Sequence, residues 1–422
     1  MKHIHFDDRS LDYELYNVLC NIVNNSEIYK SLTSEEQVFA EDLKREFESS
    51  GVHITDVDKK NRVLQLQNTI ASLESRYIRN IYTGDSNFSF GPVDDQRELA
   101  ALREYLLKFT DQQNSTSKHL VCPSQRDIVS QLLSSLHNGD VRKALWQGFI
   151  TVPADNAECL GALIKTRQLL AKELGYKSFA HKILSTRMIR TPDRVWTMLG
   201  DVLRDIESSV EDELSILGNG AEALLPWNAK YLMQQFIRQK AQAATKDAQH
   251  ILKSYLPLSA VFNGLKHILY ELFSIDMVVT PVPLSEAWGW RQNQSTNGMY
   301  KVVLSNAQEY LGTVYIDVYQ RTNKLNQAAH LTLQCGCLDT KVIFDRILNG
   351  QAAGKPPFPR QASAVILLFN FDPSSQQDPL LSLQELETFY HEFGHGLHSL
   401  LSRTNFQHLS GTRGGVDFIE VR

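Results

Sequence analysis

The spacing of apolar residues changes once along the chain, between about residues 280 and 300. Before that point apolar positions recur at intervals of three and four, which predicts amphipathic helices. We expect helices at 34–47, 63–77, 127–136, 157–174 and 193–217. Gly175 stands where a helix C-cap is expected, and Pro192 opens the last of these helices.

After about residue 298 the apolar residues form short runs rich in β-branched and aromatic side chains. These runs predict strands of a small sheet at 300–304, 312–319, 330–334 and 364–371, with a Pro- and Gly-rich loop at 350–359. Ser382 and Glu385 form a capping box that opens a further helix over 386–401. The pattern therefore predicts a mostly α-helical protein, with a helical region at 1–297 and a second region at 298–422.

The helix at 386–401 carries two opposed faces. Its core-facing side spans about 80° of arc at 100° per residue and consists of Leu386, Phe389, Phe393, Leu397 and Leu400. His391 and His395 fall on nearly the opposite side, and Glu392 lies about 100° round from His391.

Two imidazoles one helical turn apart, ~6 Å along the axis, can hold one metal ion between them. Zinc with three protein ligands keeps a fourth position for water and lowers the pKa of that water to about 7. Glu392 is placed to take the proton of this water rather than to bind the metal. Two spaced histidines and an acid also arise by chance, but the cap and the apolar stripe favour a metal site.

The residues alone leave the third ligand open. His398 lies ~4.5 Å beyond His395 along the axis, which suits substrate contact better than binding the same ion. The long-spaced metalloprotease pattern fails, since His398 stands where its glycine should be and Leu401 where its histidine should be. The remaining candidates are Asp417 and Glu420, the only acids after Glu392.

Several segments together resemble the thimet oligopeptidase family of zinc peptidases. The motif segment 389–395 is followed by matching segments at 410–413 and 417–421, and the likeness extends upstream to 167–180, 255–258 and 311–319. The resemblance implies a Zn²⁺ ion bound by His391, His395 and Glu420, with Glu392 as the catalytic base. It also implies a mostly helical, two-lobed fold around a deep channel, with the small sheet next to the zinc-binding helix.

Within that family, segment 403–408 is most similar to the mitochondrial intermediate peptidases, particularly those of fungi. This implies a monomeric endopeptidase of the mitochondrial matrix that removes N-terminal octapeptides from imported precursor proteins. The family pattern continues beyond residue 422, so we expect a chain truncated at both ends, with an incomplete zinc catalytic region. The alternative is an inactive helical fragment that binds peptides or a partner.

Charge and apolar content argue against two classes of protein, those that bind nucleic acid and those that span a membrane. A net charge of −5 without a clustered basic face argues against nucleic acid as a partner. The longest apolar run, 364–369, is too short for a membrane span of ~20 residues.

The five cysteines are scattered along the chain, which fits a reducing compartment. The pair Cys335 and Cys337 suits an apolar strand better than half of a metal site. The acidic pairs Asp7-Asp8, Glu35-Glu36 and Asp94-Asp95 are interpreted as solvated surface.

Overall fold

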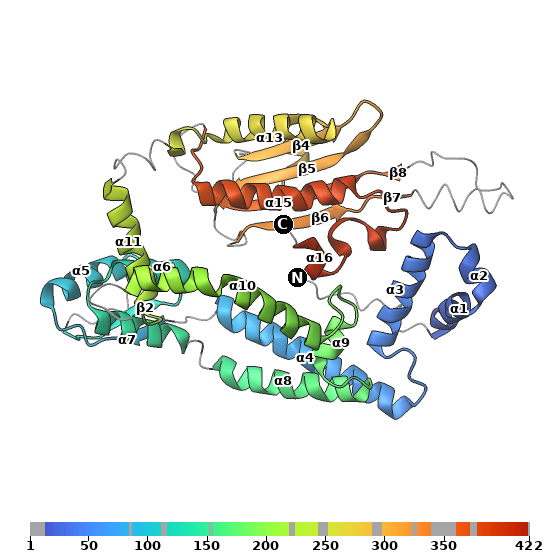
Figure 1. Ribbon diagram of the computed structural model, residues 1–422, viewed down its shortest axis with the longest axis horizontal. Helices are drawn as coiled ribbons and strands as arrows, with labels where there is room; N and C mark the ends of the chain where they lie inside the picture. Colours follow the sequence, from blue (N-terminus) through green and yellow to red (C-terminus); the bar gives the residue numbers. More distant parts are fainter. Residues whose placement is uncertain are drawn as a thin grey trace. The chain divides into compact units, whose positions relative to one another are not determined.

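A computed structural model provides the fold of the chain (Figure 1). It describes residues 13–83, 87–110, 116–151, 153, 155–218, 224–243, 252–288, 298–321, 324, 327–338, 360–371 and 378–420. The chain divides into two compact units, each with its own buried core. The helical unit contains Glu46–Lys246 with the short segment before Asn17, and the sheet unit contains Asn17–Arg45 with Asp247–Arg422.

The helical unit is built from amphipathic helices around two apolar clusters. Helices α4 (Val57–Thr83) and α8 (Asp155–Glu173) pack along each other through Val63, Ile70, Leu163 and Leu170. The second cluster joins a two-stranded ladder, β1 (Asn87–Phe90) and β2 (Leu120–Pro123), to α5 (Gln96–Leu106), α6 (Arg126–Ser135) and α7 (Gly139–Ile150). The unit also contains α9 (Phe179–Leu184), α10 (Pro192–Gly218) and α11 (Ala229–Ala243).

The sheet unit is organised around five strands in the order β3-β4-β5-β9-β6. Their bounds are β3 (Asp276–Pro281), β4 (Met299–Ser305), β5 (Tyr310–Tyr319), β6 (Ala329–Gln334) and β9 (Ser363–Phe371). Strands β5 and β9 are parallel, and the other neighbours are antiparallel. Strand β6 is therefore an edge strand. Strands β7 (Cys337–Leu338) and β8 (Arg360–Gln361) form a separate short pair.

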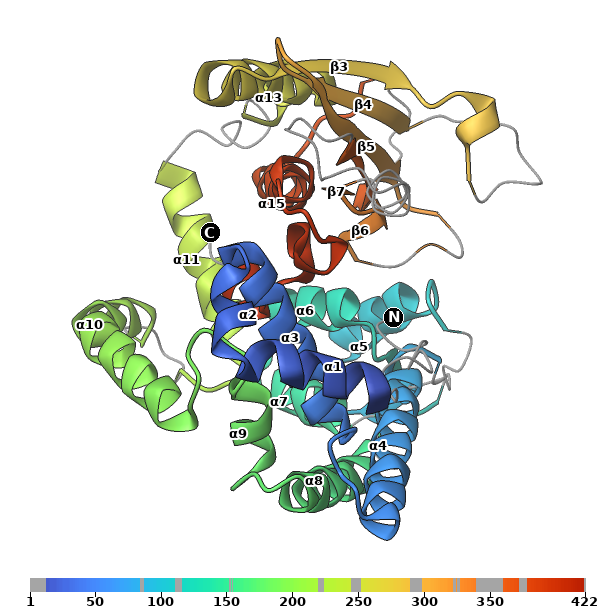
Figure 2. The same ribbon diagram turned by 90° about the vertical axis from the view of Figure 1, so that its right-hand side faces the viewer.

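Helices α13 (Leu258–Phe273) and α15 (Leu383–Leu401) contribute to one buried cluster with alternate residues of the sheet (Figure 2). Alternation along β5 places the fully buried Val314, Ile316 and Val318 in this cluster. Phe389 of α15 stacks on Phe369 of β9, with ring centroids 5.3 Å apart. The motif helix is thus held on the sheet by the apolar stripe that its sequence predicts.

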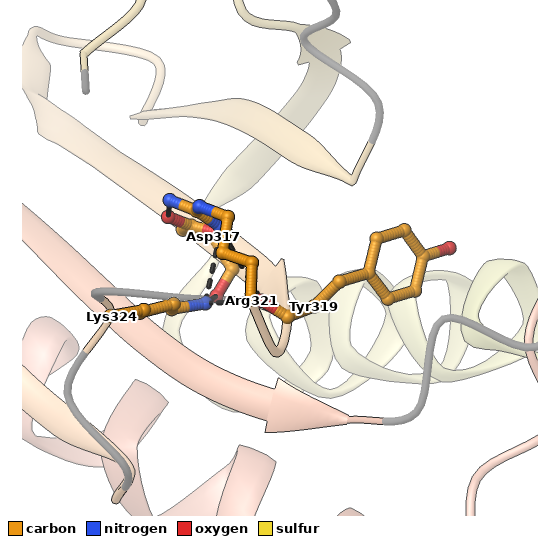
Figure 3. Close-up of polar contacts among 4 residues, drawn as sticks. All are labelled: Asp317, Tyr319, Arg321 and Lys324. Carbon is orange, nitrogen blue, oxygen red and sulfur yellow. Dashed lines mark hydrogen bonds and ion pairs between the residues drawn. The ribbon is translucent and has the colours of Figure 1, made fainter. Parts of the chain in front are cut away.

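The opposite face of β5 carries a buried group of charges, the Asp317 cluster, formed by Asp317, Arg321 and Lys324 (Figure 3). Arg321 donates to both carboxylate oxygens of Asp317, at 2.5 Å for Oδ1. Lys324 Nζ donates to Oδ1 at 2.9 Å and to the carbonyl oxygens of Asp317 and Tyr319 at 3.0 and 2.8 Å. Burial lowers the pKa of Lys324, and the hydrogen bond to Asp317 opposes that shift. These bonds hold Arg321 and Lys324, which follow β5, against the end of that strand.

The mostly helical class with a small sheet beside the motif helix is confirmed. All six predicted helices and all four predicted strands form. Their bounds agree with the expected ones within three residues, except that the helix expected at 63–77 extends over 57–83. Gly175 has φ +83°, as a C-cap glycine requires, and Pro192 is the first residue of α10. The sequence pattern missed β1, β2, β3 and β8, which are two to six residues long, and did not single out helices α5, α7, α9, α11 and α13. The predicted loop at 350–359 lies outside the described residues.

The proposed division at residue 298 stays a prediction of the sequence pattern. The structure adds that α13 and β3, which precede it, pack with the sheet. Among the described helices, none combines the length and apolar character needed to cross a bilayer.

Candidate metal centre

Helix α15 begins at a capping box. The backbone N–H of Glu385 donates to Ser382 Oγ at 3.2 Å, and the backbone N–H of Ser382 donates to Glu385 Oε2 at 2.8 Å. Two of the otherwise unpaired donors at the helix start are thereby satisfied, which fixes where the helix begins. Gly396 faces β9, where a Cβ would stand 3.6 Å from Val365, an ordinary van der Waals distance. The cap and the packing of the apolar stripe on the sheet set the rotation of the helix.

The side chains of His391, His395 and Glu420 converge at one point beside α15. The two histidine Nε2 atoms are 3.2 Å apart. Oε2 of Glu420 lies 3.6 Å from Nε2 of His391 and 3.5 Å from Nε2 of His395. Sequence reasoning from the residues left Asp417, Glu420 and His398 open as the third member. Within the described part of the chain, only Glu420 joins the two histidines in such a group.

Three atoms, Nε2 of His391, Nε2 of His395 and Oε2 of Glu420, form what we call the triangle. It has the size that a tetrahedrally coordinated cation requires. Metal–nitrogen and metal–oxygen bonds of ~2.0–2.1 Å at tetrahedral angles place ligand atoms ~3.3–3.4 Å apart. The measured separations of 3.2, 3.5 and 3.6 Å bracket that value. Burial lowers the pKa of His395, and the nearby Glu420 opposes this shift. The imidazole of His395 is therefore held neutral, with a lone pair available for a metal.

A cavity of about 420 Å³ opens over the triangle. Its lining consists of Glu387, Tyr390, His391, Gly394, His395, His398, Ile419 and Glu420. His398 thus contributes to the wall of the cavity, with its ring against Phe418 at a centroid distance of 6.0 Å. Gly394 has no neighbouring atom within 4 Å of where a Cβ would lie, so it leaves space for a ligand next to the two histidines.

Glu392 lies beside the triangle but is buried rather than part of the cavity lining. Its exposed fraction is 9%. Burial raises the pKa of Glu392, Glu420 raises it further, and His391 opposes the shift. A carboxylate whose pKa is raised accepts a proton more readily, which suits a general base.

His330 is a neighbour of the site that the sequence pattern did not indicate. It lies on β6, with Nε2 3.2 Å from Ser399 Oγ and its ring centroid 6.0 Å from that of His395. Burial lowers the pKa of His330 to about 4, with smaller contributions from His395 and His398. Its position depends on β6 pairing with β9, which no local spacing in the sequence predicts.

Glu420 is delivered to the site by the segment 402–415, which we call the strap. The strap leaves the end of α15, passes through the 3₁₀ turns Gln407–Leu409 and Gly411–Arg413, and enters the single-turn helix α16 (Val416–Ile419). Gly411 has φ +59°, and a Cβ there would lie 2.8 Å from Ser399 Oγ. The strap can therefore close onto α15 only with glycine at this position.

Cys335 and Cys337 are half-buried, and Cys337 belongs to strand β7. Neither thiol joins a metal-type group among the residues that the structure describes.

Comparison with known proteins agrees with this geometry. Residues 132–422 match the family model described as peptidase family M3. The chain is similar to the mitochondrial intermediate peptidases of Yarrowia lipolytica, at 29% identity over 97% of this chain and 52% of the relative, and of Candida albicans, at 28% over 97% and 55%. A third relative of the same name, from Aspergillus clavatus, is 27% identical over 94% of this chain and 50% of its own length.

The chain spans about half the length of the curated relatives it matches. The matched family region covers α15, the strap, α16 and Glu420 directly after it, and so contains all the residues of the triangle. The resemblance inferred from the motif is confirmed: the chain belongs to peptidase family M3, a family of metallopeptidases.

Proposed function

We propose that this chain binds one Zn²⁺ ion through His391, His395 and Glu420 and hydrolyses peptide bonds as a metalloendopeptidase. The observation that carries the proposal is the triangle of two nitrogens and one oxygen, with edges of 3.2 to 3.6 Å, beneath an open cavity. Nitrogen and oxygen ligands in this number are those that catalytic zinc sites use, and they leave a fourth position for water or substrate. All of these residues lie within the proposed catalytic region at 298–422.

A zinc ion held there supplies Lewis acidity, which lowers the pKa of its water to about 7 and polarises a carbonyl. The chain's own groups do the rest. Glu392 takes a proton from the attacking water at its carboxylate and passes it to the departing amine, a contribution of ~10²–10⁴-fold in rate. His391 and His395 each offer an imidazole nitrogen, and Glu420 supplies one negative charge against the two charges of the metal.

We further propose that the substrates are precursor proteins imported into the mitochondrial matrix, from which a monomeric enzyme removes N-terminal octapeptides. The support is the similarity to relatives named mitochondrial intermediate peptidase along nearly the whole of this chain. The open cavity above the triangle also suits a peptide, since Gly394 leaves room for its backbone beside the histidines.

The test of metallopeptidase activity begins with metal analysis of the purified chain. We expect one zinc per chain, cleavage of an internally quenched peptide, and loss of cleavage in the presence of a chelator. Glu392→Gln should retain zinc and lose activity ~10²–10⁴-fold. Glu271→Gln, which changes an exposed carboxylate of α13 outside the lining of the cavity, serves as the control and should retain both. A folded chain without stoichiometric metal would instead support the inactive peptide-binding alternative.

The substrate proposal needs a separate measurement. A precursor protein that carries an octapeptide before its mature N-terminus should lose that peptide as a single fragment, identified by mass spectrometry. Cleavage of short peptides with no processing of the precursor would retain the metallopeptidase and exclude the precursor substrate.

A further inference from the structure

Helix α3 (Ser34–Ser50) begins next to the strap, although 370 residues separate the two in sequence (Figure 1). Its first turns belong to the sheet unit together with α15 and the strap. Glu35 accepts the backbone N–H of Asn405 at Oε1 and the side-chain Nδ2 of Asn405 at Oε2, the latter at 2.6 Å. One carboxylate thus binds both donors of a single strap residue, and such charge-assisted hydrogen bonds are among the strong ones.

The side-chain and backbone oxygens of Asn405 also accept hydrogen bonds. Arg360 of β8 donates to its Oδ1 at 3.3 Å, and the backbone N–H of Leu338 in β7 donates to its carbonyl oxygen at 3.1 Å. Arg360 donates in addition to the carbonyl oxygen of Thr404. Asn405 is therefore fixed by α3 on its donor groups and by the β7–β8 pair on its acceptors.

A second contact follows one helical turn along α3. Phe39 stacks on Phe406 with ring centroids 4.3 Å apart and an angle of 1° between the planes. It also contacts the ring of His408 at a centroid distance of 5.6 Å. Residues four apart share one face of a helix, so Glu35 and Phe39 present a polar and an aromatic contact to the same part of the strap.

Glu420 depends on the strap for its position. Its side chain is 53% exposed, and it follows α16, a helix of four residues. A single helical turn has little stability of its own, because helix formation needs several turns to offset nucleation. The contacts that hold the strap before it include the close approach of Gly411 to Ser399, the ion pair of Arg403 with Glu309 and the bonds of the β7–β8 pair. The α3 contacts at Asn405 and Phe406 add the carboxylate and the aromatic ring described above.

We propose that Glu35 and Phe39 are positioning residues for the metal ligand Glu420: the start of α3 holds the strap so that Glu420 completes the triangle with His391 and His395. The proposal rests on the metal-binding part of the proposed function, not on its substrate. It assigns to helix α3 a share in metal affinity, although Glu35 and Phe39 are not among the members of the triangle.

The test measures the metal itself in the full chain. Glu35→Gln replaces one acceptor oxygen by an amide that faces the donors of Asn405, and should weaken Zn²⁺ binding ~10–100-fold in competition with a chelator. With Co²⁺ in place of zinc, the visible absorption spectrum should shift, because the geometry of the ligands changes. Glu41→Gln is the matched control: this carboxylate lies on the same helix but pairs with Tyr29 and Arg45, and its loss should leave affinity and spectrum unchanged.

Phe39 provides an independent pair of variants. Phe39→Tyr keeps a ring for stacking on Phe406 and should bind metal like the wild type, whereas Phe39→Leu removes the ring and should weaken binding. This pair of variants tests the positioning role even if Glu35→Gln does not fold.

Wild-type affinity and an unchanged Co²⁺ spectrum in both Glu35→Gln and Phe39→Leu would overturn the positioning role. Absence of metal from the wild-type chain would refute the proposed metal site, and metal binding without peptide cleavage would refute only the peptidase activity.

Discussion

The Asp317 cluster and the His391–His395–Glu420 triangle lie in the same unit but arrange their charges in opposite ways. Asp317 has a side chain that is 1% exposed and meets two cationic partners, of which Lys324 is 4% exposed. Glu420 is 53% exposed, and its partners are two imidazoles whose nitrogens point toward the same space. The first group contains donors matched to acceptors, whereas the second consists of acceptors that converge.

We interpret the Asp317 cluster as a group that stabilises the fold, and the triangle as the group arranged for the proposed metal. In the Asp317 cluster, removal of one charged side chain leaves the other charges without their partner in surroundings of low dielectric constant. In the triangle three acceptor atoms face the same space beneath an open cavity, and Glu420 is half exposed, so a change there should alter metal binding more than folding. Each of the following predictions tests one side of this contrast.

The largest effect is expected at Asp317. Asp317→Asn leaves Arg321 and Lys324 without their shared carboxylate, and removal of one partner from a buried ion pair costs about 3–5 kcal/mol. We expect the free energy of unfolding in urea to fall by about 3 kcal/mol, because Arg321 is partly exposed. Asp276→Asn, at an exposed position of β3, is the control and should have little effect. A fully stable Asp317→Asn variant would remove the contrast.

Glu420→Gln should show the reverse behaviour. The neutral amide is a poor metal ligand, and changes to groups that merely orient a ligand already cost 10–100-fold in affinity, so we expect zinc binding to weaken more than about 100-fold. Urea unfolding of the metal-free variant should match that of the metal-free wild type, since the carboxylate is half exposed. A large loss of stability in the metal-free state would mean that the triangle is also a structural element.

His330→Asn should have a smaller effect on the metal. His330 contacts Ser399 and the ring of His395, so its loss frees two neighbours of the site without removing a ligand. We expect zinc affinity to fall about 10-fold, the lower end of the range for groups that orient ligands. His267→Asn, at an exposed position of α13, should leave the affinity unchanged. Equal zinc affinities of the His330→Asn and His267→Asn variants would show that His330 does not help to position the ligands.

The smallest effect is a pH dependence of the Asp317 cluster. Burial lowers the pKa of Lys324 in the folded state, so just below its usual pKa the unfolded chain binds more protons than the folded chain. Stability therefore rises with pH across that alkaline window. Comparison of the wild type with Lys324→Met in urea between pH 8 and 10.5, values near the unperturbed lysine pKa of about 10.4, should show this slope only in the wild type. Parallel pH profiles would contradict the predicted shift.

Local patterns in the sequence predicted much of the region around the site. The capping box at Ser382, the apolar stripe of α15 and the common side of His391 and His395 follow from helical geometry alone. Glu420 was singled out only by resemblance to a family, because its distance from His391 depends on the strap and not on a helical repeat.

Contacts that depend on pairing between distant segments were not predicted. His330 reaches the site through the β6–β9 ladder. The interpretation of Glu35 as solvated surface was wrong, since this carboxylate binds Asn405 across most of the length of the chain. An acidic residue in the first turn of a helix is common, because it interacts favourably with the helix dipole, so its sequence position conceals a tertiary role.

The contact between Glu35 and Asn405 has a consequence for biosynthesis. Translation proceeds at ~5–20 residues per second, and domains fold as their parts emerge from the ribosome. Helix α3 is therefore made about 20 to 70 s before the strap that it contacts, given the 370 residues between them. During that interval Phe39 has no Phe406 on which to stack, and the histidine pair does not yet exist. The proposed metal site can therefore be complete only after the strap and Glu420 have been synthesised.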